Sequence, residues 1–229
     1  MSGNPAHTRD KVTGAIPKPT TPFLIFVLGP PCAGKSTICK LLADCCKLDH
    51  FSLGDELRSL VSSNPTGPAA RIMTKFTASE LKVFAQNVRA GTLGPANQTP
   101  KYVKERIFPE DVKPEDVRIL VDGLPRGVDR WTTFKKSVQD IWQPDKRTWA
   151  IVLDVNREVA RERFTSRGRT GDVFEKRFDE HVCSIGPIVA AMRDDGVCVV
   201  EHTTDQNSDP SVILELLEGV SGWMKDIQI

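Results

Sequence analysis

The chain has 229 residues, of which 27% are charged, and its formal net charge at pH 7 is +1. This length allows one α/β domain with a real hydrophobic core, and the balanced charge argues against a nucleic acid or a membrane surface as partner. No apolar run approaches the ~20 residues that a membrane-spanning helix needs.

The first 22 residues lack the apolar stretch of a secretory signal. They contain four prolines and few large apolar side chains, a composition typical of a flexible arm. We therefore expect an arm over residues 1–22 and a folded domain over residues 23–229.

Short, continuous apolar runs recur along the rest of the chain. Each is too short for a helix and does not alternate with polar residues, which is the pattern of parallel strands buried on both faces of a sheet. The predicted strands are 23–28, 50–53 (the shortest candidate), 119–121, 150–153 and 197–200.

Helix-compatible segments separate these strands. The alternation predicts an α/β fold with a doubly wound parallel sheet, whose ligands bind at the edge formed by the carboxyl ends of the strands. The predicted helices are 36–46, 54–62, 78–90, 100–108, 128–141, 157–166, 172–193 and 210–225.

Two regions interrupt the alternation. Residues 55–112 are helical and polar, with Pro- and Gly-rich breaks at 64–68 and 91–100, and residues 163–177 are dense in arginine. Both are interpreted as inserts that lie over the edge of the sheet.

The segment that joins the first strand to the first helix fits the phosphate-loop pattern G-x-x-x-x-G-K-[ST]. There, backbone N–H groups and the positive end of a helix converge on an anion. Lys35 would bring a mobile charge to the outer phosphates, and the Ser36 hydroxyl could bind Mg²⁺. A turn that merely joins strand to helix is the alternative. The expected phosphate-binding residues are Gly29, Pro31, Cys32, Ala33, Gly34, Lys35, Ser36 and Thr37.

Polar residues also follow two other strands. Asp122, at the end of the third strand, is suited to Mg²⁺ directly or through water, and Gly123 and Arg126 come after it. The alternative is a turn whose aspartate caps the next helix. After the second strand, Arg58 is expected in the first turn of a helix, where an arginine is unusual unless an anion or a surface ion pair balances it.

An arginine-rich segment is the fourth feature. Arg163 and Arg167 are four residues apart and share a helix face, which costs a few tenths of a kcal/mol unless a polyphosphate binds there. A solvated basic face is the alternative reading. The full set is Arg161, Arg163, Arg167, Arg169 and Arg177.

The six cysteines and four histidines suggest no metal site. No C-x-x-C pair occurs and the histidines are scattered, so zinc is not expected. Small buried thiols in a reducing compartment are the simpler interpretation. The expected location is the cytoplasm, with the nucleus as an additional alternative.

Four motifs occur in a fixed order: the phosphate loop, H-x-S-x-G-D-x-x-R, D-G-x-P-R and the arginine-rich segment. This order resembles the adenylate kinase and UMP–CMP kinase family of nucleoside monophosphate kinases. The resemblance covers most of residues 22–225. It implies a monomer with a five-stranded core, and two mobile flaps over the monophosphate (about 53–112) and over ATP (a short lid, about 163–177).

The resemblance also implies roles for the matching residues. Lys35 would contact the transferring group, Asp122 would orient Mg²⁺-bound water, and Arg163 would lie over ATP, with Gln206 in the segment that passes the adenine ring. The monophosphate (NMP) would be bound by Ser52, Gly54, Asp55, Arg58, Gly123, Arg126, Arg169 and Arg177. The catalytic set would be Lys35, Arg126, Arg167, Arg169 and Arg177.

Three residues depart from the family pattern in the monophosphate pocket: Leu53 replaces a small residue that contacts the base, Gly94 replaces a valine, and Asn97 replaces an acidic residue. The predicted function is transfer of the γ-phosphoryl group of MgATP to UMP, CMP or AMP. The alternatives are a non-catalytic nucleotide-binding P-loop module and a P-loop kinase of another small metabolite.

Overall fold

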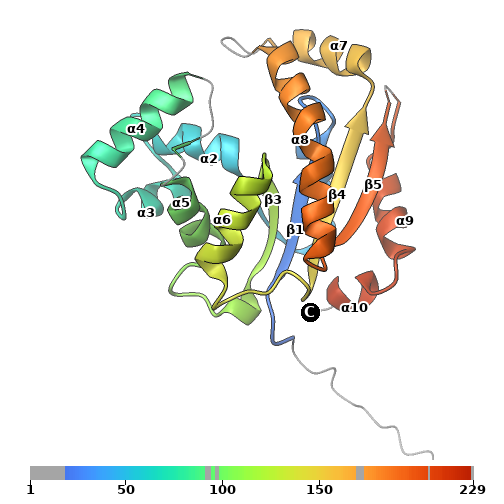
Figure 1. Ribbon diagram of the computed structural model, residues 1–229, viewed down its shortest axis with the longest axis horizontal. Coiled ribbons are helices and arrows are strands. Elements are labelled where there is room, and N and C mark those ends of the chain that lie inside the picture. The colour runs from blue at the N-terminus through green and yellow to red at the C-terminus, as the bar shows by residue number, and fades with distance from the viewer. Residues whose placement is uncertain (1–18, 91–93, 96–97, 169–172, 206, 228–229) are drawn as a thin grey trace, which may run out of the picture.

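A sheet of five parallel strands, in the order β2-β3-β1-β4-β5, forms the centre of the protein (Figure 1). The computed structural model describes residues 19–90, 94–95, 98–168, 173–205 and 207–227. The strands are β1 (Phe23–Leu28), β2 (Asp49–Ser52), β3 (Arg118–Asp122), β4 (Thr148–Val155) and β5 (Cys198–Thr204). The predicted doubly wound α/β fold is confirmed.

The sheet is buried on both faces, and β1 shows why its sequence is continuously apolar. Leu24 and Phe26 point into the hydrophobic cluster on one face, whereas Ile25 and Val27 point into the cluster on the other. Successive side chains of a strand alternate between faces, so a strand covered on both sides needs an apolar residue at every position.

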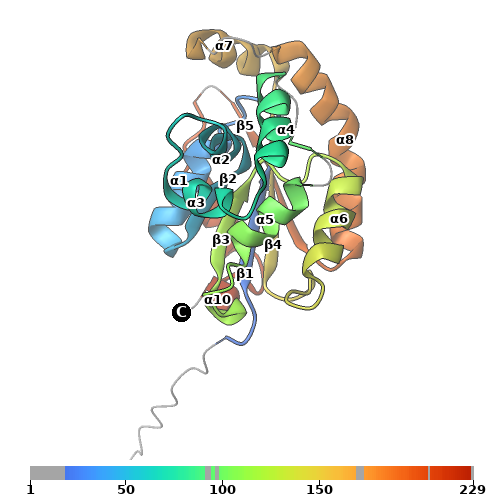
Figure 2. The ribbon, with the colours of Figure 1, turned by 90° about the vertical axis from the view of Figure 1, so that its left-hand side faces the viewer.

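Helices cover the two faces (Figures 1 and 2). The helices α1 (Lys35–Cys46), α9 (Val212–Glu218) and α10 (Trp223–Ile227) contribute to the cluster around Ile25, and α6 (Val128–Val138) contributes to the cluster around Phe26. The long helix α8 (Phe174–Asp194) contributes to both. The helix α7 (Arg157–Arg167) follows β4 and lies beyond the carboxyl ends of the strands.

The chain between β2 and β3 forms a helical lobe beside the sheet (Figure 1). The break that was expected at 64–68 is present up to residue 66, and its last two residues, Gly67 and Pro68, begin the helix α3 (Gly67–Met73), because a proline in the first turn of a helix loses no hydrogen bond. The lobe contains α2 (Leu53–Leu60), α3 (Gly67–Met73), α4 (Ala78–Arg89) and α5 (Thr99–Ile107), and a 3₁₀ turn (Pro114–Asp116) leads into β3.

An ion network around one buried arginine connects this lobe to the sheet. Arg106 of α5, 5% exposed, donates to Asp49 of β2 through Nη1 at 2.6 Å and Nη2 at 3.0 Å, and to Glu56 of α2 through Nε at 2.6 Å. The Tyr102 hydroxyl donates to the other oxygen of Glu56 at 2.8 Å. A buried guanidinium requires such partners, so the network fixes α2 and α5 against β2.

Among the boundaries that differ from the predictions, two change the interpretation. The single helix expected over 210–225 is two helices, because the chain turns at Gly222 with φ +96°, a conformation that glycine adopts without strain. The helix α2 begins one residue earlier than expected and is short, so Arg58 lies in its last turn. The argument that a positive helix end disfavours Arg58 was therefore wrong.

Candidate functional site

The phosphate loop lies between β1 and α1, at the carboxyl edge of the sheet. Gly29 has φ +155°, and a Cβ there would lie 2.8 Å from the carbonyl oxygen of Leu153, so the loop approaches β4 too closely for any other residue. Gly34 is the N-cap of α1 and has no side chain to occupy the first N–H groups of the helix. These groups can therefore bind an anion.

Lys35 is held inside this loop. Its Nζ donates to the carbonyl oxygens of Gly29 at 2.8 Å and Pro30 at 2.7 Å. Burial lowers the pKa of Lys35 from 10.5 to about 8; the nearby Asp122 opposes this change, while Arg126 and Arg177 reinforce it. Several positive charges thus converge on one place, which favours an anionic ligand.

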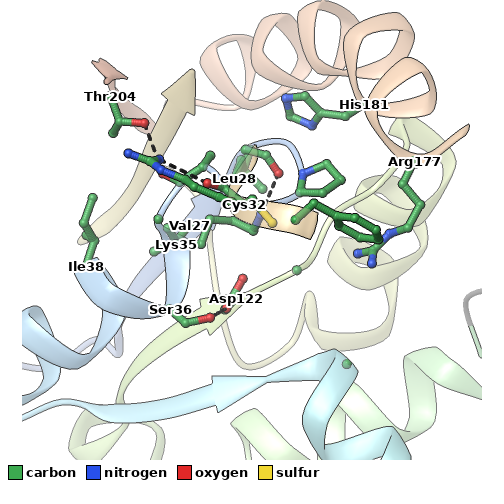
Figure 3. A pocket seen from close by; sticks show the side chains of 18 of the residues that line it. Val27, Leu28, Cys32, Lys35, Ser36, Ile38, Asp122, Arg177, His181 and Thr204 are labelled. Carbon is green, nitrogen blue, oxygen red and sulfur yellow. Dashed lines mark hydrogen bonds between the residues drawn. The ribbon is translucent and has the colours of Figure 1, made fainter. Parts of the chain in front are cut away.

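Asp122 ends β3 beside the loop, and its side chain is only 6% exposed. The Ser36 hydroxyl donates to its Oδ2 at 3.5 Å (Figure 3). Hydroxyl and carboxylate oxygens are hard ligands of the kind that Mg²⁺ prefers. Neighbouring strands of the sheet therefore bring together the two residues that the sequence predicted for a magnesium site.

A cavity of about 1390 Å³ opens over the loop. A single small-molecule pocket usually occupies roughly 300–1,000 Å³, so this cavity has room for more than one such ligand. Its wall includes the predicted residues Gly29, Pro31, Cys32, Ala33, Gly34, Lys35, Ser36, Thr37, Ser52, Gly54, Asp55, Arg58, Asp122, Gly123, Arg126, Arg163, Arg167 and Arg177. The predicted Arg169 and Gln206 lie outside the described residues.

The arginines reach the cavity from different elements. Arg58 is paired with Asp55 on α2, and Arg126 donates from Nε to the carbonyl oxygen of Gly123 at 3.3 Å. Arg163, Arg167 and Arg177 come from α7 and α8. Guanidinium groups on separate elements can surround an anion from several directions.

Unlike these arginines, Arg161 does not line the cavity and pairs with a glutamate. Its Nε donates to Glu175 at 2.8 Å, and Arg157 binds Glu175 at 2.9 Å and Asp179 at 2.6 Å. These ion pairs join α7 to α8 outside the cavity wall. Arg161 was part of the predicted arginine-rich set, and the structure gives it this pairing instead of a place in the cavity.

Of the residues of α8 that face the cavity, the sequence predicted Arg177 but not His181 or Ser184. Arg177, His181 and Ser184 line the cavity at intervals of four and three residues, so they share one helical face. Figure 3 shows Arg177 and His181 on α8. Burial, reinforced by the charge of Lys35 and opposed by Asp154, lowers the pKa of His181 from 6.5 to about 4. The polar stripe at helical spacing was the signal that could have revealed this wall.

The end of β5 and the segment that follows it form another wall of the cavity. The Thr204 hydroxyl donates to the carbonyl oxygens of Asp154 at 3.1 Å and Ala33 at 3.3 Å, which ties the end of β5 to the phosphate loop. Ser208, Asp209 and Pro210 continue the wall. Residues that precede and follow Gln206 in the sequence, Thr204 and Ser208, thus both line the cavity.

Comparison with known proteins is consistent with this geometry. A family described as "AAA domain" matches residues 28–177. The adenylate kinase of Clostridium tetani is 29% identical over 201 residues, which cover 83% of this chain and 84% of that protein. The adenylate kinase of Oenococcus oeni is 30% identical (82% and 92% covered), and the UMP-CMP kinase of Lentinula edodes is 28% identical (78% and 73% covered).

Within the described residues, none of the helices combines the length and the apolar character that crossing a membrane requires.

Proposed function

Because this chain belongs to the P-loop family described as AAA domain, and to the adenylate kinase and UMP–CMP kinase family of nucleoside monophosphate kinases, we propose that it transfers the γ-phosphoryl group of ATP to a nucleoside monophosphate. The observation that carries the proposal is the convergence of a phosphate loop, a buried aspartate and five arginines on one cavity. Phosphoryl transfer depends on positioning and on neutralising charge, and these residues can do both.

ATP would occupy the half of the cavity next to the phosphate loop. The N–H groups at the start of α1 would bind its phosphates, and Lys35 would leave the Gly29 and Pro30 carbonyls for the transferring group. Arg163 and the segment 204–210 would border the nucleoside. ATP is the donor that the kinase relatives imply.

The donor set of Ser36 and Asp122 fits Mg²⁺. When bound, the ion would supply positive charge that stabilises the negative charge developing on the phosphates. The Ser36 hydroxyl would bind the ion, and Asp122 would hold its water ligands. The buried position of Asp122 keeps this carboxylate in one orientation.

The monophosphate would occupy the half between α2, the segment after β3, and α8. Arg58 and Arg126 would exchange their present partners, Asp55 and Gly123, for the acceptor phosphate. The lid arginines Arg167 and Arg177 would then enclose both phosphate groups and exclude water. We include Arg169 in this role on the resemblance alone.

Packing accounts for two of the departures from the family pattern, Leu53 and Gly94. Leu53 is 1% exposed and packs in the core cluster, so its size gives no argument about the base. Gly94 packs tightly, because a Cβ there would lie 2.5 Å from Thr99 Oγ1 and 3.0 Å from the ring of Phe84. The acceptor remains to be chosen among AMP, CMP and UMP by assay.

The decisive experiment incubates the purified full-length protein with MgATP and, separately, with AMP, CMP, UMP, dCMP and GMP, and measures ADP formation. Turnover with one monophosphate supports the proposal and identifies the acceptor. ATP binding without turnover on any of them would overturn it and favour a non-catalytic module or a kinase of another metabolite. We also propose a reducing compartment such as the cytoplasm, because all six cysteines are free thiols, and a monomer on the family resemblance alone.

A further inference from the structure

Three side chains of different chemistry meet behind the phosphate loop. They are the thiol of Cys39 on α1, the imidazole of His50 on β2 and the carboxylate of Asp122 at the end of β3. One ligand atom of each lies within 4.8 Å of those of the other two. The parallel pairing of β2 with β3, in which His50 lies opposite Leu120 and Ser52 opposite Asp122, brings these distant residues together.

The three groups are shielded from solvent. Cys39 is 0% exposed and Asp122 is 6% exposed. His50 Nε2 is buried and has no hydrogen-bond partner among the described residues. A buried polar atom without a partner is costly, and it is rare enough in folded proteins to require an explanation.

We propose that Cys39, His50 and Asp122 form a binding site for Zn²⁺. Sulfur, nitrogen and oxygen donors together are typical of zinc, whereas Mg²⁺ takes oxygen ligands and does not compete well for a thiol or an imidazole. Bound zinc would give His50 Nε2 the partner that it lacks. The thiol proton of Cys39 would leave to solvent as the thiolate binds.

The geometry is close to what the ion requires. Zinc–ligand bonds of about 2.0–2.3 Å place tetrahedral ligands roughly 3.3–3.8 Å apart. Ligand atoms that already lie within 4.8 Å of one another need only small rotamer changes to reach this arrangement. Asp122 lines the cavity, so water from the cavity can supply the fourth ligand.

Zinc at this site would regulate the enzyme. It would bind the carboxylate that we assign to the magnesium site and so inhibit phosphoryl transfer. This consequence rests on the proposed function, whereas zinc binding itself does not. The two can therefore be tested separately.

The binding test uses the full-length protein without nucleotide. Zn²⁺ affinity is measured by competition with a chromophoric chelator, and Co²⁺ is used as a spectroscopic probe, because a cobalt–thiolate bond gives a charge-transfer band in the near ultraviolet. Cys39→Ala and His50→Gln are compared with the matched controls Cys46→Ala, on the same helix, and His202→Gln. Circular dichroism and ATP affinity report whether each variant is folded.

We expect one tightly bound Zn²⁺ and a cobalt–thiolate band. Cys39→Ala should abolish the band, and both ligand variants should lose about 100-fold or more in zinc affinity, while the controls retain it. Unchanged zinc affinity in folded Cys39→Ala and His50→Gln, or no thiolate band in the wild type, would overturn the site. If Cys39→Ala does not fold, the zinc affinity of His50→Gln and the wild-type cobalt spectrum test the site.

The activity test adds Zn²⁺ at fixed Mg²⁺. Wild-type turnover should fall at zinc concentrations that leave Cys39→Ala active. Equal inhibition of both proteins would overturn the regulatory role. A protein that binds zinc as expected but shows no kinase activity would refute the proposed function and leave the zinc site standing.

Discussion

Arg163 on α7 donates a hydrogen bond from Nη1 to the carbonyl oxygen of Cys32 at 3.2 Å, and from Nη2 to the carbonyl oxygen of Asp205. One guanidinium thus joins α7, the phosphate loop and the segment after β5. Both acceptors are neutral, so an ATP phosphate would be a stronger partner for the same group. Arg163 is already positioned at the wall that we assign to ATP.

Replacing Arg163 by alanine should therefore weaken ATP binding. Loss of a hydrogen bond to a charged group costs about 1.5–3 kcal/mol, which corresponds to roughly a 10- to 100-fold rise in the KM for ATP. The matched control is Arg161→Ala on the same helix, where the lost partner is Glu175. Steady-state kinetics at varied ATP measure both. An equal rise in the two variants would contradict the assignment of Arg163.

Lys35→Met should abolish most of the turnover while leaving the fold intact. The ammonium is the point charge that would follow the transferring group, and a cation in that position is worth on the order of 10³-fold in rate. Lys40→Met, an exposed position on the same helix, is the control. ADP release under saturating substrates and circular dichroism give the two readouts. Near-normal turnover in Lys35→Met would show that Lys35 has another role.

The sequence predicted the centre of this site well because its signals are local. The strand 23–28, the loop 29–37 and the start of α1 are consecutive, so one apolar run and one glycine pattern specify their arrangement. Asp122 was predicted for the same reason: it directly follows a buried strand. Parallel strands then place such residues at a common edge.

The features that the sequence did not predict depend on contacts between distant segments, or on the position of a residue within a helix. The break expected at 64–68 ends at residue 66, because Gly67 and Pro68 already form the start of α3, where a proline is tolerated. Cys39 and His50 have no informative spacing, and they meet only because α1, β2 and β3 pack together. The cavity wall formed by His181 on α8 depends on where a long helix crosses the sheet.

Asp122→Asn should raise the Mg²⁺ concentration required for half-maximal activity and lower the maximal rate by about 100-fold or more, because a neutral amide holds Mg²⁺-bound water less strongly. The control is Asp140→Asn, an exposed position after α6. Initial rates measured against Mg²⁺ at constant ATP separate the two effects. A variant that loses rate with an unchanged Mg²⁺ requirement would place Asp122 outside the ion's coordination.

His181 should make the protein acid-sensitive. Its pKa is lowered by burial from 6.5 to about 4, so between these values the unfolded chain binds a proton that the folded protein does not. Stability is therefore lost as the pH falls from 6.5 towards 4, by at most about 3 kcal/mol. Urea unfolding at pH 7.5 and 4.5 should show a smaller loss in His181→Gln than in the wild type. Identical losses would show that His181 titrates normally in the folded protein.

Gly94→Ala tests the packing of the helical lobe. A Cβ at this position would lie 2.5 Å from Thr99 Oγ1 and 3.0 Å from a ring carbon of Phe84, and both neighbours are buried. The overpacking should cost about 1–3 kcal/mol of unfolding free energy, measured by urea denaturation. Thr99→Ala removes the nearest atom, and its hydroxyl has no hydrogen-bond partner among the described residues, so the double variant should regain part of the loss.

The control for this substitution is Gly186→Ala in α8. An added Cβ at Gly186 would have no atom of the described residues within 4 Å. Alanine is the better helix former there, so this variant should gain roughly 0.5–1 kcal/mol. Opposite signs at the two positions would show that close packing, rather than backbone entropy, determines the glycine at 94. A stabilised Gly94→Ala would mean that Thr99 and Phe84 can move aside, and that this contact does not fix Gly94 against α5.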